Sequence, residues 1–252
     1  MSADLDLAER AARAAGDVLL SRYGRPPEGL AAKSTDTDPV SDADREAEWA
    51  IHELLRSERP DDGLLSEEGA HAETASGRRW VVDPLDGTVN YLYGFPVWAV
   101  SVALEDDAGS ALAVVLDPVR DECFSAVRGG GARLAGAPLH VRRPADLGQA
   151  LVGTGFAYDP VRRAQQAGVV RRLLPRVRDI RRVGAAALEL AWIASGRMDA
   201  YYERGLNRWD WAAGRLLVTE AGGVVTALEG EPEGLLAAAT PDLLRDLAAL
   251  VD

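Results

Sequence analysis

The hydrophobic positions of the first half predict two helices followed by a set of strands. Apolar side chains recur every three to four residues over positions 3–22, which predicts an amphipathic helix there. A second helix is expected from Ser41, because Ser41 and Asp44 have the spacing of a capping box and an apolar stripe follows them. Short apolar runs then predict strands, which we expect to form an antiparallel meander, over residues 80–83, 97–104, 111–116 and 123–127.

Beyond about residue 145 the pattern changes to strands that alternate with helices. The expected strands lie near residues 150–154, 179–183, 199–202 and 223–227, and the expected helices near 160–175, 185–196, 210–221 and 241–250. Such alternation is typical of a layered arrangement of helices and a sheet. We therefore expect an N-terminal α+β half over residues 1–144 and a C-terminal α/β half over residues 145–252, packed as one compact unit.

Composition restricts the classes of partner. The chain has 252 residues, of which 47% are hydrophobic, enough for a substantial core. Its 40 acidic and 28 basic residues give a formal net charge of -12, which disfavours nucleic acid and anionic membranes as partners. An acidic protein can still bind an anionic substrate when divalent cations lie between the two, so the charge is also compatible with a metal site.

The cysteine count and the N-terminus indicate a cytoplasmic protein. A single cysteine, Cys123, excludes an internal disulfide and a cysteine-rich zinc site, and it suits a reducing compartment. We expect it to be a small buried side chain. Charged residues interrupt the first twenty positions, so they read neither as a signal peptide nor as a spanning helix.

The histidines and a run of three glycines could suggest other chemistries, but both are better explained by structural roles. The histidines His52, His71 and His140 have no serine or cysteine nucleophile motif near them, which disfavours acyl transfer. The three glycines at residues 129–131 lack the following Lys-Ser or Lys-Thr of a nucleotide-binding loop, and they stand between two expected strands. We interpret them as a hairpin turn.

The strongest local signal is the sequence DPLDGT, which follows a short apolar run. Asp83 and Asp86 are three residues apart, and a chain turned by Pro84 and Gly87 can direct both carboxylates to one point. Converging carboxylates repel each other unless cations lie between them, and Mg²⁺ prefers carboxylate and carbonyl oxygens, so the Leu85 carbonyl is a further candidate ligand. The alternative is a type I turn in which Asp and Gly serve the backbone geometry alone.

The longer sequence DPLDGTVN, at residues 83–90, resembles a signature of the inositol monophosphatase family. Other blocks resemble that family in its order: Lys33 with residues 38–41, Asp44, SEEG at 66–69, RVGAAA at 182–187, NRWDWAAG at 207–214 and TEAGG at 219–223. The resemblance covers nearly the whole chain. It implies an α+β fold, the layered α-β-α-β-α sandwich of the inositol monophosphatase or sugar phosphatase type.

The resemblance also implies a metal centre with two or three Mg²⁺ ions. Glu67, Asp83 and the Leu85 carbonyl would hold one ion, and Asp83, Asp86 and Asp210 a second. Taken singly, Glu67 could be a solvated surface acid, and Asp210 could be an acid favoured at a helix N-terminus.

Catalytic and substrate contacts follow from the same resemblance. Glu67 would take a proton from the attacking water, Thr88 would position that water, and Asp44 would orient Thr88. The residues implied in substrate binding are Asp86, Gly87, Thr88, Gly184, Ala185, Ala186, Glu203 and Asp210. Many family members carry Thr or Ser where this chain has Ala185, so one side-chain hydrogen bond to the substrate is absent.

The expected activity is Mg²⁺-dependent hydrolysis of a small polyol phosphate, with inositol 1-phosphate as the favoured substrate and direct attack by a metal-activated water. Asn90 followed by Tyr91 resembles the inositol type more than the nucleotide type. Alternatives are a histidinol-phosphate, fructose-1,6-bisphosphate or 3'-phosphoadenosine phosphatase, or, in another class, a non-catalytic regulatory binding module. The resemblance further implies a lithium-sensitive homodimer.

Overall fold

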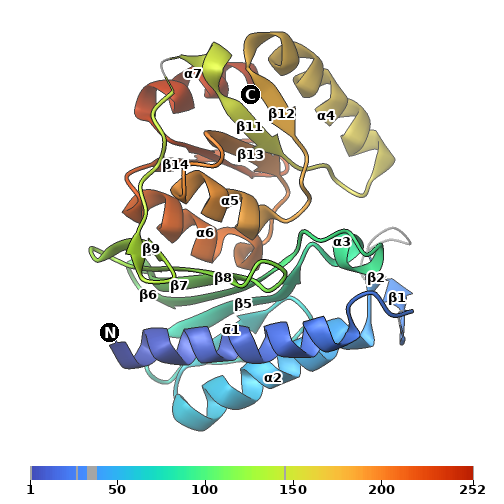
Figure 1. Cartoon of the computed structure of the whole chain (residues 1–252), viewed down its shortest axis with the longest axis vertical. Coiled ribbons are helices and arrows are strands. Elements are labelled where there is room, and N and C mark those ends of the chain that lie inside the picture. The colour runs from blue at the N-terminus through green and yellow to red at the C-terminus, as the bar shows by residue number, and fades with distance from the viewer. Residues whose placement is uncertain (1, 27, 33–38, 145, 252) are drawn as a thin grey trace.

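The computed structural model describes residues 2–26, 28–32, 39–144 and 146–251, so Lys33 and Asp38 of the family resemblance lie outside the described residues. The helices are α1 (Ser2–Arg22), α2 (Asp42–Glu58), α3 (Thr88–Leu92), α4 (Pro160–Leu173), α5 (Ala186–Ala194), α6 (Arg208–Glu220) and α7 (Pro241–Val251). Figure 1 shows five layers: α1 and α2, a large sheet, α5 and α6, a smaller sheet, and an outer layer with α4 and α7. The expected layered α-β-α-β-α sandwich is confirmed.

The large sheet has eight strands in the order β10-β9-β8-β7-β6-β5-β3-β4. Their bounds are β3 (Gly63–Ser66), β4 (His71–Ala72), β5 (Arg79–Asp86), β6 (Ala99–Asp106), β7 (Gly109–Asp117), β8 (Glu122–Val127), β9 (Gly131–Leu134) and β10 (Ala137–Pro138). The predicted antiparallel meander is confirmed for β5 to β8. The sequence did not reveal β3, a four-residue strand that pairs in parallel with β5 and places Glu67 directly beyond its end.

The smaller sheet has the order β12-β11-β13-β15-β14. Its strands are β11 (Leu151–Thr154), β12 (Asp179–Arg181), β13 (Ala200–Arg204), β14 (Val224–Leu228) and β15 (Gly234–Ala238). Four of them match the prediction. The fifth, β15, is rich in Leu and Ala, which favour helices, yet it is extended because it pairs with both β13 and β14. The remaining elements are the short pair β1 (Ala31–Ala32) and β2 (Pro39–Val40) and the 3-10 turns η1 (Leu147–Gln149) and η2 (Leu174–Arg176).

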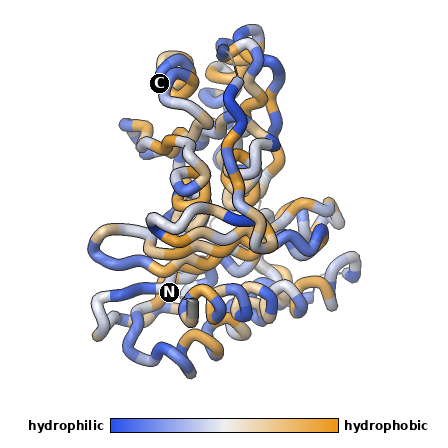
Figure 2. Tube along the Cα trace, turned by 60° about the vertical axis from the view of Figure 1, so that its left-hand side comes forward, coloured by the Kyte–Doolittle hydropathy of each residue, from blue (hydrophilic) through white to orange (hydrophobic). Residues whose placement is uncertain are grey.

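Hydrophobic side chains fill the spaces between layers. Figure 2 shows hydrophobic segments gathered along the strands of the large sheet, with hydrophilic segments on the outer helices. The layer of α5 and α6 is buried on both sides, and Leu188, Ala191 and Leu217 pack there against Val81 and Phe124 of the large sheet. This double burial fixes the N-termini of α5 and α6 relative to the sheet.

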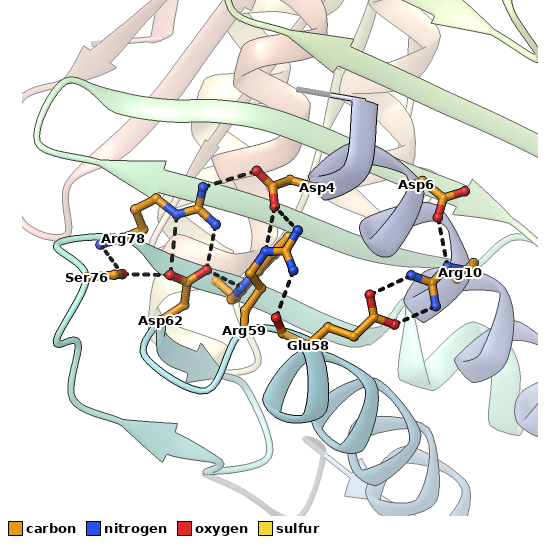
Figure 3. A network of polar contacts seen from close by, with 9 residues as sticks. Asp4, Asp6, Arg10, Glu58, Arg59, Asp62, Ser76 and Arg78 are labelled. Atoms are coloured by element: carbon orange, nitrogen blue, oxygen red, sulfur yellow. Dashed lines mark hydrogen bonds and ion pairs between the residues drawn. The ribbon is translucent and has the colours of Figure 1, made fainter.

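A network of ion pairs, drawn in Figure 3, joins α1 to the start of β5. The Asp4 carboxylate accepts hydrogen bonds from Arg59 Nε at 2.7 Å and from Arg78 Nη1 at 3.1 Å. Arg78 also pairs with Asp62, which accepts a further hydrogen bond from the Trp80 indole at 3.1 Å. Because the Trp80 side chain is buried, this network anchors the outer helices to the large sheet.

Two smaller expectations are confirmed. Cys123 is buried and forms no disulfide. The residues between β8 and β9 form a turn in which the Gly130 N–H donates to the Val127 carbonyl, so the glycine run is a hairpin turn. Of the helices in the described ranges, none has both the length and the apolar content that crossing a bilayer requires.

Candidate active site

The two carboxylates of the DPLDGT sequence share one side of β5 because the strand carries a bulge. Contrary to expectation, the strand does not end at Asp83 but continues to Asp86. Its pairing with β6 shifts between them, since Asp83 lies opposite Ser101 and Asp86 opposite Ala99. Side chains three positions apart on a regular strand point to opposite faces, and one extra residue restores a common face. The bulge, rather than the turn we expected, therefore directs both carboxylates into one pocket.

The Asp86 carboxylate lies at the N-terminus of α5. Its oxygens accept hydrogen bonds from the backbone N–H groups of Ala186 at 3.0 Å, Ala187 at 2.8 Å and Leu188 at 3.4 Å. Helix N-termini carry unpaired N–H groups and partial positive charge, so they attract a carboxylate. Burial nevertheless raises the pKa of Asp86 to about 7, although these N–H groups lower it, and the charge of Glu67 adds to the rise.

The pKa values of the neighbouring carboxylates are also raised. Burial raises the pKa of Asp83 well above its usual range, and the charges of Glu67, Asp86 and Asp210 raise it further. Asp210 lies in the first turn of α6, where it accepts a hydrogen bond from the Asn207 N–H at 2.6 Å, and its pKa is also raised by burial and by Glu67. Four acids thus gather in a poorly solvated place, where protons or cations must offset their charge.

One pocket of about 480 Å³ collects the predicted residues. It is lined by every residue predicted to bind metal or substrate, namely Glu67, Asp83, Leu85, Asp86, Gly87, Thr88, Gly184, Ala185, Ala186, Glu203 and Asp210. Asp44, the remaining predicted catalytic residue, is fully buried and does not line the pocket. Its position is therefore behind the pocket wall.

Asp44 reaches the pocket through Thr88. The Thr88 hydroxyl lies 3.3 Å from Asp44 Oδ1 and 3.1 Å from the Leu85 carbonyl oxygen, so it can donate to either. The other Asp44 oxygen, Oδ2, accepts the Ser41 N–H at 2.9 Å and the Ser41 hydroxyl at 2.5 Å. The return contact of the expected capping box is thus present, and it fixes the carboxylate that faces Thr88.

The segment before α5 approaches the DPLDGT loop closely. Gly87 and Gly184 have positive φ angles of 93° and 88°, and a Cβ on Gly87 would lie 3.2 Å from the Gly184 carbonyl oxygen. The Asn90 amide joins the same two segments, since it donates to the carbonyls of Val97 at 2.8 Å and Val183 at 2.9 Å. Glycine at both positions and this amide therefore set the width of the pocket.

Glu203 is held by the second sheet. The Tyr201 hydroxyl donates a hydrogen bond to its carboxylate, and a Cβ on Gly155 would collide with that carboxylate. Burial raises the pKa of Glu203, while Tyr201 and Arg182 lower it. Glu203 is thus held in the pocket as a hydrogen-bond acceptor, and a Cβ at position 155 would displace its carboxylate.

Other lining residues were missed by sequence reasoning. They come from the end of β13, the start of α4 and the connections that follow β11, β12 and β13: Phe156, Ala157, Tyr158, Asp159, Arg162, Arg182, Arg204, Gly205, Leu206 and Asn207. Most belong to no motif. The available signal was their place directly after expected strands, where ligands commonly bind in sheets flanked by helices.

The donor set suits a hard divalent cation. All the candidate ligands present oxygen, which Mg²⁺ prefers, and the burial of three repelling carboxylates supplies a reason to bind positive charge. In the described part of the chain, no three His, Cys, Asp or Glu side chains already stand in a metal-binding arrangement. Asp83, Asp86 and Asp210 each accept a backbone N–H hydrogen bond instead.

Comparison with known proteins identifies the same family that the sequence motifs resemble. The model of the Inositol monophosphatase family matches residues 1–251. The chain belongs to the inositol monophosphatase family. It is 43% identical over 231 residues to the inositol-1-monophosphatase of Mycobacterium leprae, covering 86% of this chain and 79% of that protein. It is 40% identical over 228 residues to the Nus factor SuhB of Escherichia coli strain K12, covering 90% and 85%.

Solved structures of the inositol monophosphatase family share the fold. The extragenic suppressor protein suhB from Bartonella henselae superposes with a TM-score of 0.92 at 36% identity, covering 99% of this chain and 98% of that one. Membership of the family supports a phosphatase that acts on small phosphate esters. Inositol monophosphatases are generally metal-dependent, typically on Mg²⁺, which agrees with the donor set of the pocket.

Proposed function

We propose that the chain is a Mg²⁺-dependent phosphoric monoester hydrolase that converts inositol 1-phosphate to inositol and phosphate. The observation that carries this proposal is the convergence of four carboxylates, Glu67, Asp83, Asp86 and Asp210, on a pocket that glycine-containing loops keep open. Buried acids of this kind attract divalent cations, and a phosphate dianion cannot approach them without such cations.

Asp83 would contribute to two metal positions, one completed by Glu67 and the Leu85 carbonyl and the other by Asp86 and Asp210. Bound Mg²⁺, as two or three ions, would neutralise the phosphoryl oxygens, make water more acidic and stabilise the departing alkoxide. The Asp83 contact with Glu67 and the anchoring of Asp86 on α5 hold this donor set together.

The chain's own residues would direct the water. Glu67 accepts a proton from the attacking water, and the Thr88 hydroxyl positions that water in line with the leaving group. Asp44 orients Thr88, because its carboxylate is fixed by Ser41 on one side and faces the Thr88 hydroxyl on the other. The backbone N–H groups of Gly87 and Thr88 are available to the phosphate, and no phosphoenzyme is required.

The polyol would lie against the second half of the chain. Glu203 can accept hydrogen bonds from its hydroxyls, and residues 184–186 can contact it through backbone groups. Ala185 offers no side-chain hydrogen bond, which removes one means of discriminating between substrates. Histidinol phosphate, fructose 1,6-bisphosphate and 3'-phosphoadenosine derivatives therefore remain alternative substrates.

The experiment is phosphate release from a panel of these four esters with saturating Mg²⁺ and again with a chelator. We expect inositol 1-phosphate to have the highest kcat/KM, and chelator to abolish release from every ester. A higher kcat/KM for another ester would change the assigned substrate but not the proposed hydrolytic mechanism. Release that persists in chelator would contradict the metal requirement.

A non-catalytic regulatory role is the candidate from another class. Several relatives carry the name Nus factor SuhB, which points to a regulatory role for those proteins. This chain retains every carboxylate of the implied metal centre, which favours catalysis. Absence of phosphate release from the whole panel, with an intact fold, would favour the regulatory role.

We further propose a cytoplasmic, lithium-inhibited homodimer that does not bind nucleic acid. The acidic net charge of -12 supports the last point. Light scattering at micromolar concentration should give the mass of a dimer, and a monomer would contradict the proposal. Inhibition by millimolar LiCl, with NaCl as the control, tests the lithium site.

A further inference from the structure

A further buried acid, Glu189, lies behind the wall of the pocket. It stands in the first turn of α5, is fully buried and does not line the pocket itself. One of its carboxylate oxygens, Oε1, has no hydrogen-bond partner in the described part of the chain, and it lies 2.6 Å from the place of a Cβ on Gly153. A buried carboxylate oxygen without a partner lowers stability. Stability of the fold therefore does not explain this acid.

The other oxygen of Glu189 holds the peptide group that joins Val183 to Gly184. This oxygen, Oε2, accepts a hydrogen bond from the Gly184 N–H at 3.3 Å. The carbonyl of the same peptide group, that of Val183, accepts the Asn90 amide at 2.9 Å. Because the N–H and C=O of a trans peptide point in opposite directions, Glu189 and Asn90 hold this peptide group from its two sides. We call the two side chains and the peptide group the peptide clamp.

The peptide clamp acts on the part of the backbone that is expected to meet the polyol. Gly184 has a φ of 88°, and a glycine backbone loses more freedom on folding than any other, so its conformation depends on such contacts. Gly184 and Ala185 line the pocket. From Ala186 onward the backbone is held by α5 itself and by the hydrogen bonds to Asp86. Loss of the clamp should therefore move Gly184 and Ala185 and leave the Asp86 carboxylate in place.

Glu189 serves the clamp as a hydrogen-bond acceptor and not as a charge. Burial raises the pKa of Glu189 well above its usual range, and the charges of Glu203 and Asp86 raise it further. The Gly184 N–H and the Arg182 guanidinium lower this pKa without cancelling the rise. A protonated carboxyl still has a carbonyl oxygen for the Gly184 N–H, and the amide of a glutamine has the same oxygen in the same shape.

We infer that Glu189 is a positioning residue for substrate specificity, which holds the Gly184 backbone in the shape that receives the polyol. This inference rests on the proposed phosphatase activity and concerns the side of the pocket that meets the leaving group. Glu189 does not line the pocket, so it acts on the polyol only through the backbone that it holds. A contact to the polyol that is equal in the ground and transition states changes KM and not kcat.

The test compares inositol 1-phosphate with 4-nitrophenyl phosphate, whose leaving group has no hydroxyl groups to meet the polyol contacts. Glu189→Leu removes the acceptor and keeps the site filled. Its kcat/KM for inositol 1-phosphate should fall roughly 5- to 30-fold through a higher KM, the range for an unpaired buried N–H, and kcat should change little. Its kcat/KM for 4-nitrophenyl phosphate should stay within about 2-fold of wild type, because that ester does not use the clamped backbone. Glu189→Gln keeps the acceptor, so both values should stay within about 3-fold of wild type.

Asp199→Asn is the matched control. Asp199 is also a fully buried acid, but it lies before β13, where it accepts hydrogen bonds from Arg142 at 2.6 Å and from the Leu151 N–H at 2.8 Å, and it does not line the pocket. This variant should lower Tm and leave the ratio of kcat/KM for the two esters at the wild-type value. A ratio lowered as far as in Glu189→Leu would overturn the positioning role.

The remaining outcomes separate the positioning role from the proposed function. Equal losses for both esters in Glu189→Leu, an unchanged KM for inositol 1-phosphate, or a loss as large in Glu189→Gln would each overturn the positioning role and leave the phosphatase proposal standing. If circular dichroism shows that Glu189→Leu does not fold, Asn90→Ala, which removes the opposite side of the clamp, must lower the same ratio, and an unchanged ratio overturns the role. Hydrolysis of neither ester by wild type would overturn the phosphatase proposal itself.

Discussion

Replacing Asp44 by Asn isolates one contact of the proposed mechanism. In the wild type, Asp44 Oδ2 receives two hydrogen bonds from Ser41, and Oδ1 faces the Thr88 hydroxyl at 3.3 Å. An asparagine keeps its oxygen toward the two Ser41 donors and therefore turns its NH₂ toward Thr88. The hydroxyl must then accept a hydrogen bond from the amide, and its proton is directed to the Leu85 carbonyl, 3.1 Å away. The attacking water loses its oriented partner.

The size of the effect follows from this geometry. A hydrogen bond to a charged group contributes about 1.5–3 kcal/mol, and the alternative acceptor at Leu85 places this one in the lower half of that range. We expect kcat to fall roughly 10- to 30-fold in Asp44→Asn. In Thr88→Val, kcat should fall at least as far. The double variant should have a kcat little below that of Thr88→Val, because the two residues act as one unit.

The assay is steady-state kinetics with inositol 1-phosphate at saturating Mg²⁺. Ser41→Ala is the matched control, since it removes the hydroxyl bond to Asp44 Oδ2 but keeps the Ser41 N–H bond to the same oxygen and leaves Thr88 in place. It should cost about 0.5–2 kcal/mol of stability through the lost helix cap, with kcat within a few-fold of wild type. If the losses from Asp44→Asn and Thr88→Val multiply in the double variant, the two residues act independently and the reasoning is wrong.

Two further predictions concern the pocket. Glu203→Gln should raise KM for inositol 1-phosphate about 10-fold and change kcat little, because the Glu203 contact to the polyol is the same in the ground and transition states. Gly155→Ala should have the same effect, because its Cβ would collide with Glu203. An effect of either variant confined to kcat would contradict this role. In metal-free protein, the raised pKa values of Asp83, Asp86 and Asp210 mean that the folded state keeps protons which the unfolded state releases near pH 4. Their stabilising contribution is lost as pH rises through about 7 for Asp86, so Tm should fall between pH 5.5 and 8, and Mg²⁺ should restore it. A flat Tm profile without metal would argue against the buried acid cluster.

Local patterns in the sequence were sufficient for most of the fold. The two N-terminal helices and the meander have strong periodicity, and the Ser41 to Asp44 spacing predicted a contact that the structure contains. The extended conformation of β15 could not be predicted, because Leu and Ala favour helix and only pairing with β13 and β14 makes it a strand. The division into halves at residue 144 stays a prediction.

The site shows the same limit. The DPLDGT sequence identified Asp83 and Asp86, but the bulge that turns both to one side depends on pairing with β6 and has no local signal. Arg162 was missed because it reaches the pocket only through the placement of α4 near Gly205, which follows β13. Residue roles within the pocket stay predictions until variants are measured.

The most direct test of the metal-centred mechanism is a Mg²⁺ activation curve of metal-stripped protein with inositol 1-phosphate. Wild type should release no phosphate without added metal and should gain activity as Mg²⁺ is titrated. Asp83→Asn, which removes the carboxylate shared by both metal positions, should stay inactive at every Mg²⁺ concentration while its circular dichroism remains that of wild type. Full activity of metal-stripped wild type, or normal Mg²⁺ activation of Asp83→Asn, would contradict the account.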